Sequence, residues 1–387
     1  MNPGAKFFYL RFRQTILRLI GRVLASNHVC TAPRPAEIKK ILFIRTDRIG
    51  DMVLSTPAIR SLKRKYPQAR LTVLASPSNH ALLRHNPDVD EVVIFNAPSI
   101  NDPRKVLRLL QRLRHSGFDA VVDPLVSHDL KTALIGFVTG APVRVGFAGS
   151  GREVFFSRSL PGMDAKRHIV DLTLDLMMEL GAAEPERSPR IVLTQPEITW
   201  ARGWVKINNP EDRPVVGVHP GAHYPSQRWP VEHYATLAVA LQREHRCRVV
   251  LTGGPADHEW IDRIRHASSE TLAVYRAADL RKAAALMSQF HVMVCNNSGP
   301  LHLAAAFDVP TVSFMGPTNA LRWWPVGPAH RVLRIQELVC LGCERGVCPR
   351  GTLECLRRIH PVTAVEAVKG ILEDAHLRGS QYRHSYA

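Results

Sequence analysis

Short apolar runs alternate with amphipathic stretches along most of this chain, and this alternation constrains the fold more than any other feature of the sequence. The first run, Ile41–Ile44, has no charged side chain, as expected for a strand buried on both faces of a parallel sheet. The pattern predicts a doubly wound α/β domain. Further apolar runs lie at 71–75, 92–95, 120–123 and 143–147, and helical patterns lie at 51–66, 79–85, 103–116, 128–138 and 168–180.

The alternation stops at a proline-bearing stretch, 185–212, and then restarts. We therefore predict two successive Rossmann-like domains, 36–195 and 196–375, followed by a tail at 376–387. A length of 387 residues suits two domains. In the second domain we expect strands at 215–218, 248–251, 292–295 and 311–314, and helices at 231–245, 256–267, 279–288, 299–307 and 362–375.

Residues 1–35 differ from the rest because apolar and basic side chains alternate there, with no acidic residue before Glu37. Arginines interrupt the apolar stretch, which argues against a signal-peptide core and against a membrane-spanning helix. The pattern is typical of a basic amphipathic helix on an anionic membrane surface, followed by a linker. A helix packed on the main body is the alternative. The basic residues are Lys6, Arg11, Arg13, Arg18 and Arg22.

The whole chain is strongly basic, with 51 Lys+Arg against 34 Asp+Glu and a formal net charge of +17. Such an excess indicates an anionic partner, which is nucleic acid, a phosphorylated small molecule or an acidic membrane. Nucleic acid is the least favoured of these, because the sequence has no recognised binding module and no basic stripe interleaved with aromatic residues. Seven cysteines are too few for a disulfide scaffold.

The first turn between a strand and a helix contains Arg48-Ile49-Gly50-Asp51. Ligands of open α/β sheets bind at the carboxyl ends of the strands, so Asp51 would face the ligand crevice. A carboxylate there can act as a general base on an attacking hydroxyl. The alternative is a carboxylate that only stabilises the helix N-terminus. The turn lacks the G-x-G-x-x-G pattern of dinucleotide-binding proteins.

Basic residues surround this turn and continue along the following helix. Such a cluster can receive an acceptor that carries phosphates or carboxylates. The alternative is a helix face that is simply solvated. The residues concerned are Arg45 and Arg48 in the turn, and Arg60, Lys63, Arg64 and Lys65 on the helix.

Three turns rich in small residues follow three predicted strands of the second domain. Glycine turns expose backbone N–H groups that can hold a phosphate. Arg228 could add a charge-assisted contact, and Asp257 could accept hydrogen bonds from a ribose or cap a helix. Together the turns predict a nucleotide-phosphate site. They are His219-Pro220-Gly221-Ala222, Thr252–Asp257 and Asn296–His302.

Four of the seven cysteines concentrate in one short stretch near the C-terminus. Such density indicates a structural metal site in an intracellular protein. A set of reduced thiols, or a redox-sensitive pair, is the alternative. The four are Cys340, Cys343, Cys348 and Cys355.

These motifs, in this order, resemble those of glycosyltransferase family 9, the ADP-heptose:lipopolysaccharide heptosyltransferases and their relatives. The likeness covers roughly residues 39–375. The matching segments are Ile41–Arg60, His219–Ala222 with Arg228-Trp229-Pro230, Thr252–Asp257, Asn296–Ala306 and Phe314–Thr318.

The resemblance implies a GT-B fold, in which two Rossmann-like domains face each other across a cleft. The first domain would hold the acceptor and the second the nucleotide sugar. Transfer would be inverting and independent of metal, and no cofactor is expected. Asp51 falls on the family's proposed general base. Backbone donors near Gly221, Ser298 and Gly299, with His302, would stabilise the leaving diphosphate.

Two positions depart from the family's pattern. The family often has a lysine at the position of Gln227 and an aspartate at the position of Asn297. Together the two changes remove one positive and one negative group, so the local charge changes little but the donor contacts differ. The identity of the donor therefore stays open.

The expected function is transfer of a heptose or related sugar, with ADP-heptose as the implied donor, to a lipopolysaccharide core or similar acidic glycolipid. The expected location is the cytoplasmic face of the inner membrane, as a peripheral protein. One alternative is a nucleotide-sugar epimerase or hydrolase of the same fold, which would need no acceptor. Another is a sugar-binding homologue without catalytic activity.

Overall fold

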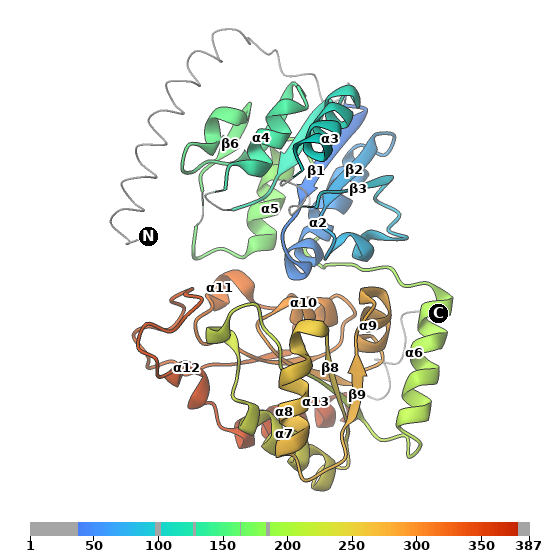
Figure 1. Ribbon diagram of the computed structural model, residues 1–387, viewed down its shortest axis with the longest axis vertical. Helices are drawn as coiled ribbons and strands as arrows, with labels where there is room; N and C mark the ends of the chain where they lie inside the picture. Colours follow the sequence, from blue (N-terminus) through green and yellow to red (C-terminus); the bar gives the residue numbers. More distant parts are fainter. Residues whose placement is uncertain (1–37, 97–101, 127–128, 163, 183–185, 378–387) are drawn as a thin grey trace. The chain divides into compact units, whose positions relative to one another are not determined.

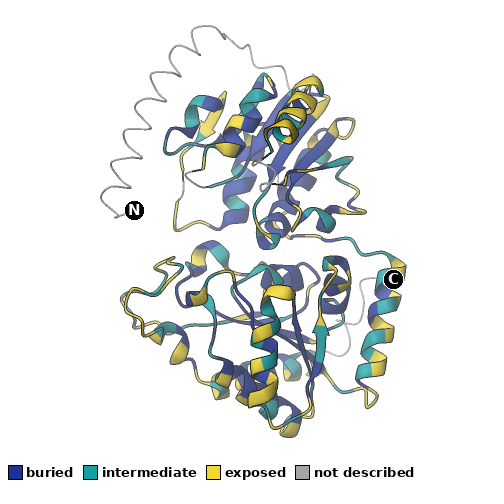
Figure 2. Cartoon of the chain, in the orientation of Figure 1, coloured by how far each residue is buried: buried dark blue, intermediate teal, exposed yellow. Residues whose placement is uncertain are grey.

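The computed structural model describes residues 38–96, 102–126, 129–162, 164–182 and 186–377. The predicted amphipathic segment at 1–35 lies outside the described residues. The chain divides into two compact units between Arg187 and Ser188. In both units the central strands are buried and the outer faces of the helices are exposed (Figures 1 and 2).

The first unit contains a six-stranded parallel sheet with the strand order β3-β2-β1-β4-β5-β6. Helices α2 and α5 pack against each other, as do α3 and α4. The elements are β1 (Lys40–Arg45), α2 (Ile49–Lys65), β2 (Arg70–Ala75), the 3-10 helix η2 (His80–Leu83), β3 (Glu91–Ile94), α3 (Pro103–His115), β4 (Ala120–Asp123), α4 (Lys131–Val138), β5 (Val143–Phe147), η4 (Arg152–Phe155), β6 (Arg158–Leu160) and α5 (Ile169–Met178).

Helix α2 forms although it has a proline in its interior. Pro57 has no N–H to donate to the carbonyl of Val53, and the hydroxyl of Thr56 donates to that carbonyl at 2.7 Å instead. Asp51 lies in the first turn, and Lys63, Arg64 and Lys65 lie in the last turn. This distribution complements the helix dipole at both ends.

The second unit contains another six-stranded parallel sheet, with the order β12-β11-β10-β7-β8-β9. Helix α7 packs against α8 and α13. The elements are α6 (Gln195–Asn208), β7 (Val215–His219), η5 (Pro225–Gln227), α7 (Val231–Arg243), β8 (Arg248–Gly253), η6 (Pro255–Asp257), α8 (His258–Ala267), β9 (Ala273–Arg276), α9 (Leu280–Met287), β10 (Val292–Asn296), α10 (Gly299–Ala305), β11 (Thr311–Phe314), α11 (Ala320–Trp323), β12 (His330–Leu333), α12 (Glu354–Arg357) and α13 (Pro361–Leu377).

Helix α6 lies in the stretch that the sequence assigned to a proline-bearing junction. Pro196 stands in its first turn, where a missing N–H does no harm, and Thr194 with Glu197 forms a capping box. Glu197 also forms a bidentate ion pair with the buried Arg281 of α9, at 2.6 and 2.8 Å. Burial alone would raise the pKa of Glu197, but hydrogen bonds from Arg281 and Thr194 lower it to about 2.

The strands and principal helices predicted from the sequence are confirmed, apart from 79–85, where the structure has the 3-10 helix η2. The edge strands β6, β9 and β12 were not predicted, because their residues are largely half-buried or exposed and form no apolar run. Within the described part of the chain, no helix is both long and apolar enough to cross a membrane.

Each sheet has one position where the chain reverses its direction of winding. In the first unit this switch point lies between β1 and β4, and in the second between β7 and β10. Ligands of open α/β sheets bind outside the carboxyl ends of the strands at this position. The loops that follow these four strands are therefore where a site is expected.

Candidate functional site

Asp51 lies in the first turn of α2, just beyond the carboxyl end of β1. The guanidinium of Arg45, which is 2% exposed, contacts its carboxylate at 3.3 Å and donates to its backbone carbonyl at 3.2 Å. Arg45 also donates to the carbonyl of Pro124, which follows β4 on the other side of the switch point, at 3.2 Å. Arg45 thus holds Asp51 in place, and its predicted contact with an acceptor stays a prediction.

Asp47 is a second carboxylate in this loop, and the sequence analysis did not single it out. Its Oδ1 lies 3.3 Å from Nε of Arg45. Its backbone carbonyl accepts hydrogen bonds from Asn79 at 3.2 Å and Ser76 at 3.1 Å, so the loop after β2 fixes its position. Burial raises the pKa of Asp47 to about 7, Arg45 opposes this shift, and the charge of Asp51 adds to it. The sequence signal that could have revealed Asp47 is its position four residues before Asp51, in the same turn at the end of β1.

The end of β4 contributes a buried ion pair to the same sheet edge. Asp123 and Arg152 are 0% and 1% exposed and lie 2.6 Å apart. Asp123 also accepts the N–H of Leu125 at 3.1 Å, and Arg152 donates to the carbonyl of Leu125 and to Thr132. The pair is neutral overall, so it supports the loop after β4 without adding net charge to the switch point.

The structure spreads the other predicted acceptor residues along α2. Arg48 is exposed at the N-cap, close to Asp51 in the sequence. Arg60 lies nine residues beyond Asp51, about 14 Å along the helix axis, and Lys63 lies about 18 Å away. Lys63 forms an ion pair with Asp90 at 2.8 Å. Arg60 and Lys63 are therefore not gathered beside Asp51, because the helix runs away from the strand ends.

In the second unit, Gly221 allows the turn after β7 to approach the turn after β8. A Cβ at this position would lie 2.0 Å from Oδ1 of Asp257 and 2.8 Å from Nε2 of His219, so only glycine fits. Oδ2 of Asp257 accepts the N–H of Gly254 at 3.0 Å and lies 3.7 Å from His219. Burial lowers the pKa of His219. Asp257 thus joins the two turns, and its contact with a ribose stays a prediction.

Asn296 connects three segments at the second switch point, and the sequence analysis did not give it a role. Its side chain is fully buried at the end of β10 and donates to the carbonyls of Pro220 at 2.7 Å and Gly221 at 3.2 Å. It accepts the backbone N–H of Trp229 at 2.9 Å. The Trp229 indole stacks on Phe314 with ring centroids 4.1 Å apart. The turn after β7 is therefore held by Asn296 at its start, and the segment at Trp229 that follows it is held by Asn296 and Phe314.

The two residues before Trp229 have partners within the second unit. Gln227, where the family often has lysine, donates to the hydroxyl of Thr318 at 3.3 Å. Arg228 donates twice to the carbonyl of Ala222, at 3.0 and 3.1 Å, and its guanidinium lies 4.7 Å from the ring centre of Trp260. Both side chains stabilise the neighbouring turns, and their contacts with a donor stay predictions.

The other predicted donor residues follow β10. Asn297 and Ser298 lie in the turn, and Ser298 is the N-cap of α10, which begins at Gly299. The hydroxyl of Ser298 donates to the carbonyl of Asn296 at 3.3 Å. His302 is buried, and its ring lies 6.4 Å from that of Trp323. These residues thus follow β10 on one side of the second switch point, and Gly221 follows β7 on the other side.

The four cysteines near the C-terminus line one small apolar cavity of about 50 Å³. Burial raises the pKa of Cys355 to about 11, and the charges of the other three thiols add to this shift. Among the residues that the structure describes, no group of three or more His, Cys, Asp or Glu side chains is arranged to hold a metal ion. The four thiols thus lie around one cavity, and a structural metal site there stays a prediction.

Comparisons with known proteins identify the family. The model of glycosyltransferase family 9 (heptosyltransferase) matches residues 106–353, which is more than half of the chain. The chain belongs to glycosyltransferase family 9. It is 31% identical over 312 residues to lipopolysaccharide heptosyltransferase 2 of Salmonella typhimurium, and the match covers 76% of this chain and 88% of the relative.

Two solved structures share the fold of this chain. The E. coli ADP-heptose lipopolysaccharide heptosyltransferase II has a TM-score of 0.72 and 26% identity, over 87% of this chain and 99% of that one. A family 9 glycosyltransferase from Veillonella parvula has a TM-score of 0.78 and 21% identity, over 87% and 98%. The expected GT-B fold class is thereby confirmed, and the protein is a glycosyltransferase.

Proposed function

We propose that this glycosyltransferase moves a heptose from ADP-heptose to an acidic glycolipid acceptor of the lipopolysaccharide core, with Asp51 as the general base. The observation that carries the proposal is the carboxylate of Asp51 at the first switch point, held at 3.3 Å by the buried Arg45. The names of the similar Salmonella typhimurium and E. coli proteins support the sugar and the acceptor. The relatives do not favour the epimerase, hydrolase or non-catalytic alternatives.

The proposed reaction is a single displacement at the anomeric carbon. Asp51 takes the proton of an acceptor hydroxyl while its oxygen forms the new bond to the anomeric carbon. The bond from that carbon to the diphosphate oxygen breaks, and its electron pair leaves with the nucleoside diphosphate. Backbone N–H groups in the turns at Gly221, Ser298 and Gly299 would stabilise the charge that develops there.

Asp47 would assist this proton transfer. Asp47 and Asp51 share the single guanidinium of Arg45. When Asp47 is ionised, its negative charge attracts the acceptor proton toward this pair of carboxylates, and it shares the positive charge of Arg45 with Asp51. When Asp47 is protonated, below a pH of about 7, this help is lost. The rate constant kcat should therefore decline as the pH falls through 7.

The variant Asp47→Asn tests this coupling. We expect kcat at pH 8 to fall and the inflection near pH 7 to disappear. The raised pKa also means that ionised Asp47 is penalised in the folded state, so wild-type stability decreases as the pH rises from about 4 to about 7 and then levels off. The stability gained by the variant over the wild type should thus be larger at pH 8 than at pH 5, and absent below a pH of about 4. An unchanged pH–rate profile would contradict the role given to Asp47.

The donor can be identified by ligand-induced stabilisation of the full chain. A ligand that binds only the folded protein raises its melting temperature. At a concentration of 100 times its Kd, it adds about 2.7 kcal/mol to the free energy of unfolding. We expect a large shift with ADP and ADP-heptose, and small shifts with UDP-, GDP- and CMP-sugars. A large shift with another nucleotide sugar and none with ADP-heptose would overturn the proposed donor.

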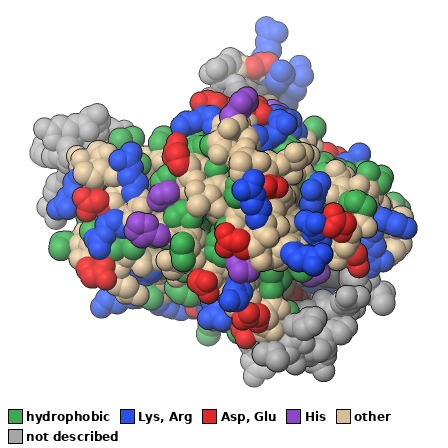
Figure 3. All heavy atoms as spheres, turned by 90° about the horizontal axis from the view of Figure 1, so that it is seen from below, with side chains coloured by type: hydrophobic (Ala, Val, Ile, Leu, Met, Phe, Trp, Pro, Cys, Tyr) green, Lys and Arg blue, Asp and Glu red, His purple; other side chains and the backbone are tan. Residues whose placement is uncertain are grey.

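The proposed location is the inner face of the inner membrane. The support is the alternation of arginines and apolar residues in segment 1–35, whose placement lies outside the described residues. On the face seen in Figure 3, basic and acidic side chains are interspersed, so the net positive charge is not gathered there. The membrane contact is accordingly assigned to the N-terminal segment rather than to that face.

A further inference from the structure

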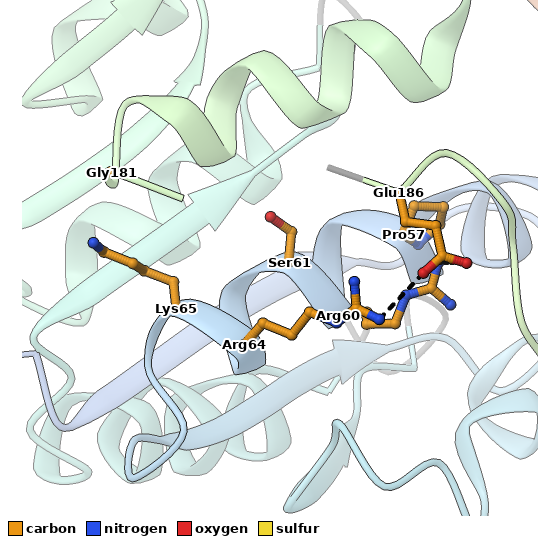
Figure 4. Close-up of a pocket in the computed structure, with 7 residues that line it drawn as sticks. All are labelled: Pro57, Arg60, Ser61, Arg64, Lys65, Gly181 and Glu186. Atoms are coloured by element: carbon orange, nitrogen blue, oxygen red, sulfur yellow. Dashed lines mark hydrogen bonds and ion pairs between the residues drawn. The ribbon is translucent and has the colours of Figure 1, made fainter. Parts of the chain in front are cut away.

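A cavity of about 240 Å³ lies within the first unit, between the second half of α2 and the chain that follows α5 (Figure 4). It does not include Asp51 or the loops at the switch point. Seven residues line it, and four of them carry a charge. They are Pro57, Arg60, Ser61, Arg64, Lys65, Gly181 and Glu186.

The charges in this cavity are unbalanced. Arg60 and Arg64 extend along α2 toward Glu186, and their guanidinium nitrogens lie 3.3 and 3.2 Å from its two carboxylate oxygens (Figure 4). Lys65 adds a third cation and runs beside Gly181. Among the described residues that line the cavity, three cations thus face one carboxylate, and these four side chains sum to a charge of +2.

The arrangement suits an oxyanion. Arginine guanidinium groups bind carboxylate and phosphate oxygens, and each of the two arginines already places one nitrogen on a different carboxylate oxygen of Glu186. Ser61 lines the same wall and offers a hydroxyl donor. A phosphomonoester carries nearly two negative charges at neutral pH, which matches the local charge that remains when Glu186 is counted.

We propose that this pocket, called here the Arg60 pocket, binds a phosphomonoester group of the glycolipid acceptor. The proposal rests on the proposed function. Arg60 lies about 14 Å and Arg64 about 20 Å from Asp51 along the axis of α2. The phosphate would therefore belong to a part of the acceptor several bonds away from the hydroxyl that reacts. Binding energy from such a remote group strengthens the acceptor complex without taking part in the displacement.

Two variants with opposite expected effects test the Arg60 pocket. Arg64→Gln with Lys65→Gln removes two exposed cations of the pocket, and Glu186→Gln removes the carboxylate that competes with the ligand. We expect the first variant to raise KM for a phosphorylated acceptor about tenfold, which two lost ion pairs of ordinary strength can supply. The second should lower this KM several-fold. With the enzymatically dephosphorylated acceptor, both variants should match the wild type.

Arg70→Gln is the matched control, because Arg70 is an equally exposed arginine of the same unit that pairs with Glu91 outside the pocket. It should change neither KM nor kcat. Equal KM changes with the phosphorylated and dephosphorylated acceptors would overturn the proposal. So would loss of binding to phosphatidylglycerol vesicles by the double variant with no change in acceptor KM, because the pocket would then hold a lipid headgroup.

A binding measurement separates this proposal from the proposed transfer reaction. Calorimetric titration of the full chain with the phosphorylated acceptor, without donor, reports on the pocket even if no heptose is transferred. A weaker Kd in the double variant supports the pocket whether or not the wild type has transferase activity. An unchanged Kd overturns it, also in a fully active enzyme.

Discussion

Replacing Asp51 with asparagine should lower kcat by about 10²- to 10⁴-fold, the range that general-base catalysis contributes. An amide oxygen can still accept the hydrogen bond from Arg45, so the local geometry should persist, but it cannot take up the proton of the acceptor hydroxyl. The Kd for the donor should stay within twofold, because the predicted donor residues all lie in the second unit. Steady-state rates and calorimetric titration with the nucleotide check the two expectations.

A matched control is Asp175→Asn, which removes a carboxylate from an exposed ion pair with Arg167 in the same unit. Its kcat should equal that of the wild type. If Asp51→Asn turned over at a rate within a few-fold of the wild type, Asp51 would not be the general base. The alternative from the sequence, a carboxylate that only stabilises the start of α2, would then hold, and the variant should lose stability rather than activity.

The second large effect concerns stability. Arg152→Met should lower the free energy of unfolding of the first unit by about 3–5 kcal/mol, because removal of one partner leaves the other charge buried without compensation. Asp123 is fully buried, and Arg152 is its partner at 2.6 Å. Urea unfolding followed by circular dichroism measures the loss as a shift of the transition midpoint to lower urea.

The double variant Arg152→Met with Asp123→Leu should recover much of this loss, since replacing both partners of a buried pair by apolar residues is often neutral. The control is again Arg70→Gln, whose exposed pair with Glu91 contributes at most about 1 kcal/mol. A midpoint for Arg152→Met close to that of the control would show that the buried pair contributes little. Destabilisation of the double variant beyond the single one would also contradict the argument.

Much of the fold follows from local sequence signals. The runs at β1 and β7 predict buried strands, and in α3 the apolar residues Val106, Leu109, Leu110 and Leu113 repeat with helical spacing. The elements that the sequence did not predict were missed for physical reasons. The edge strand β6 is only three residues long and mostly exposed, so it has no apolar pattern to read. Helix α6 was missed because Pro196 suggested a linker, whereas a proline in the first turn is compatible with a helix.

Some residues of the candidate site could likewise be predicted from the local sequence, and others could not. Asp51 and Gly221 were found because each follows a recognisable strand and belongs to a motif with a chemical reason. Asp47 and Asn296 were missed because their importance lies in contacts with distant residues. Asn296 reaches the turn after β7, 75 residues earlier in the chain, and Arg45 reaches Pro124, 79 residues later.

The sequence by itself determined the parallel sheets, the glycine turns and the candidate base, because these depend on periodicity and residue type within short windows. Only the tertiary structure decided which strand lies beside β1 and β7, and hence which side chains meet at each switch point. It also showed that Arg45 supports two carboxylates, and that Arg60 and Arg64 line a separate pocket. The reason is that strand order and burial arise from contacts between residues far apart in the chain, on which a local pattern carries no information.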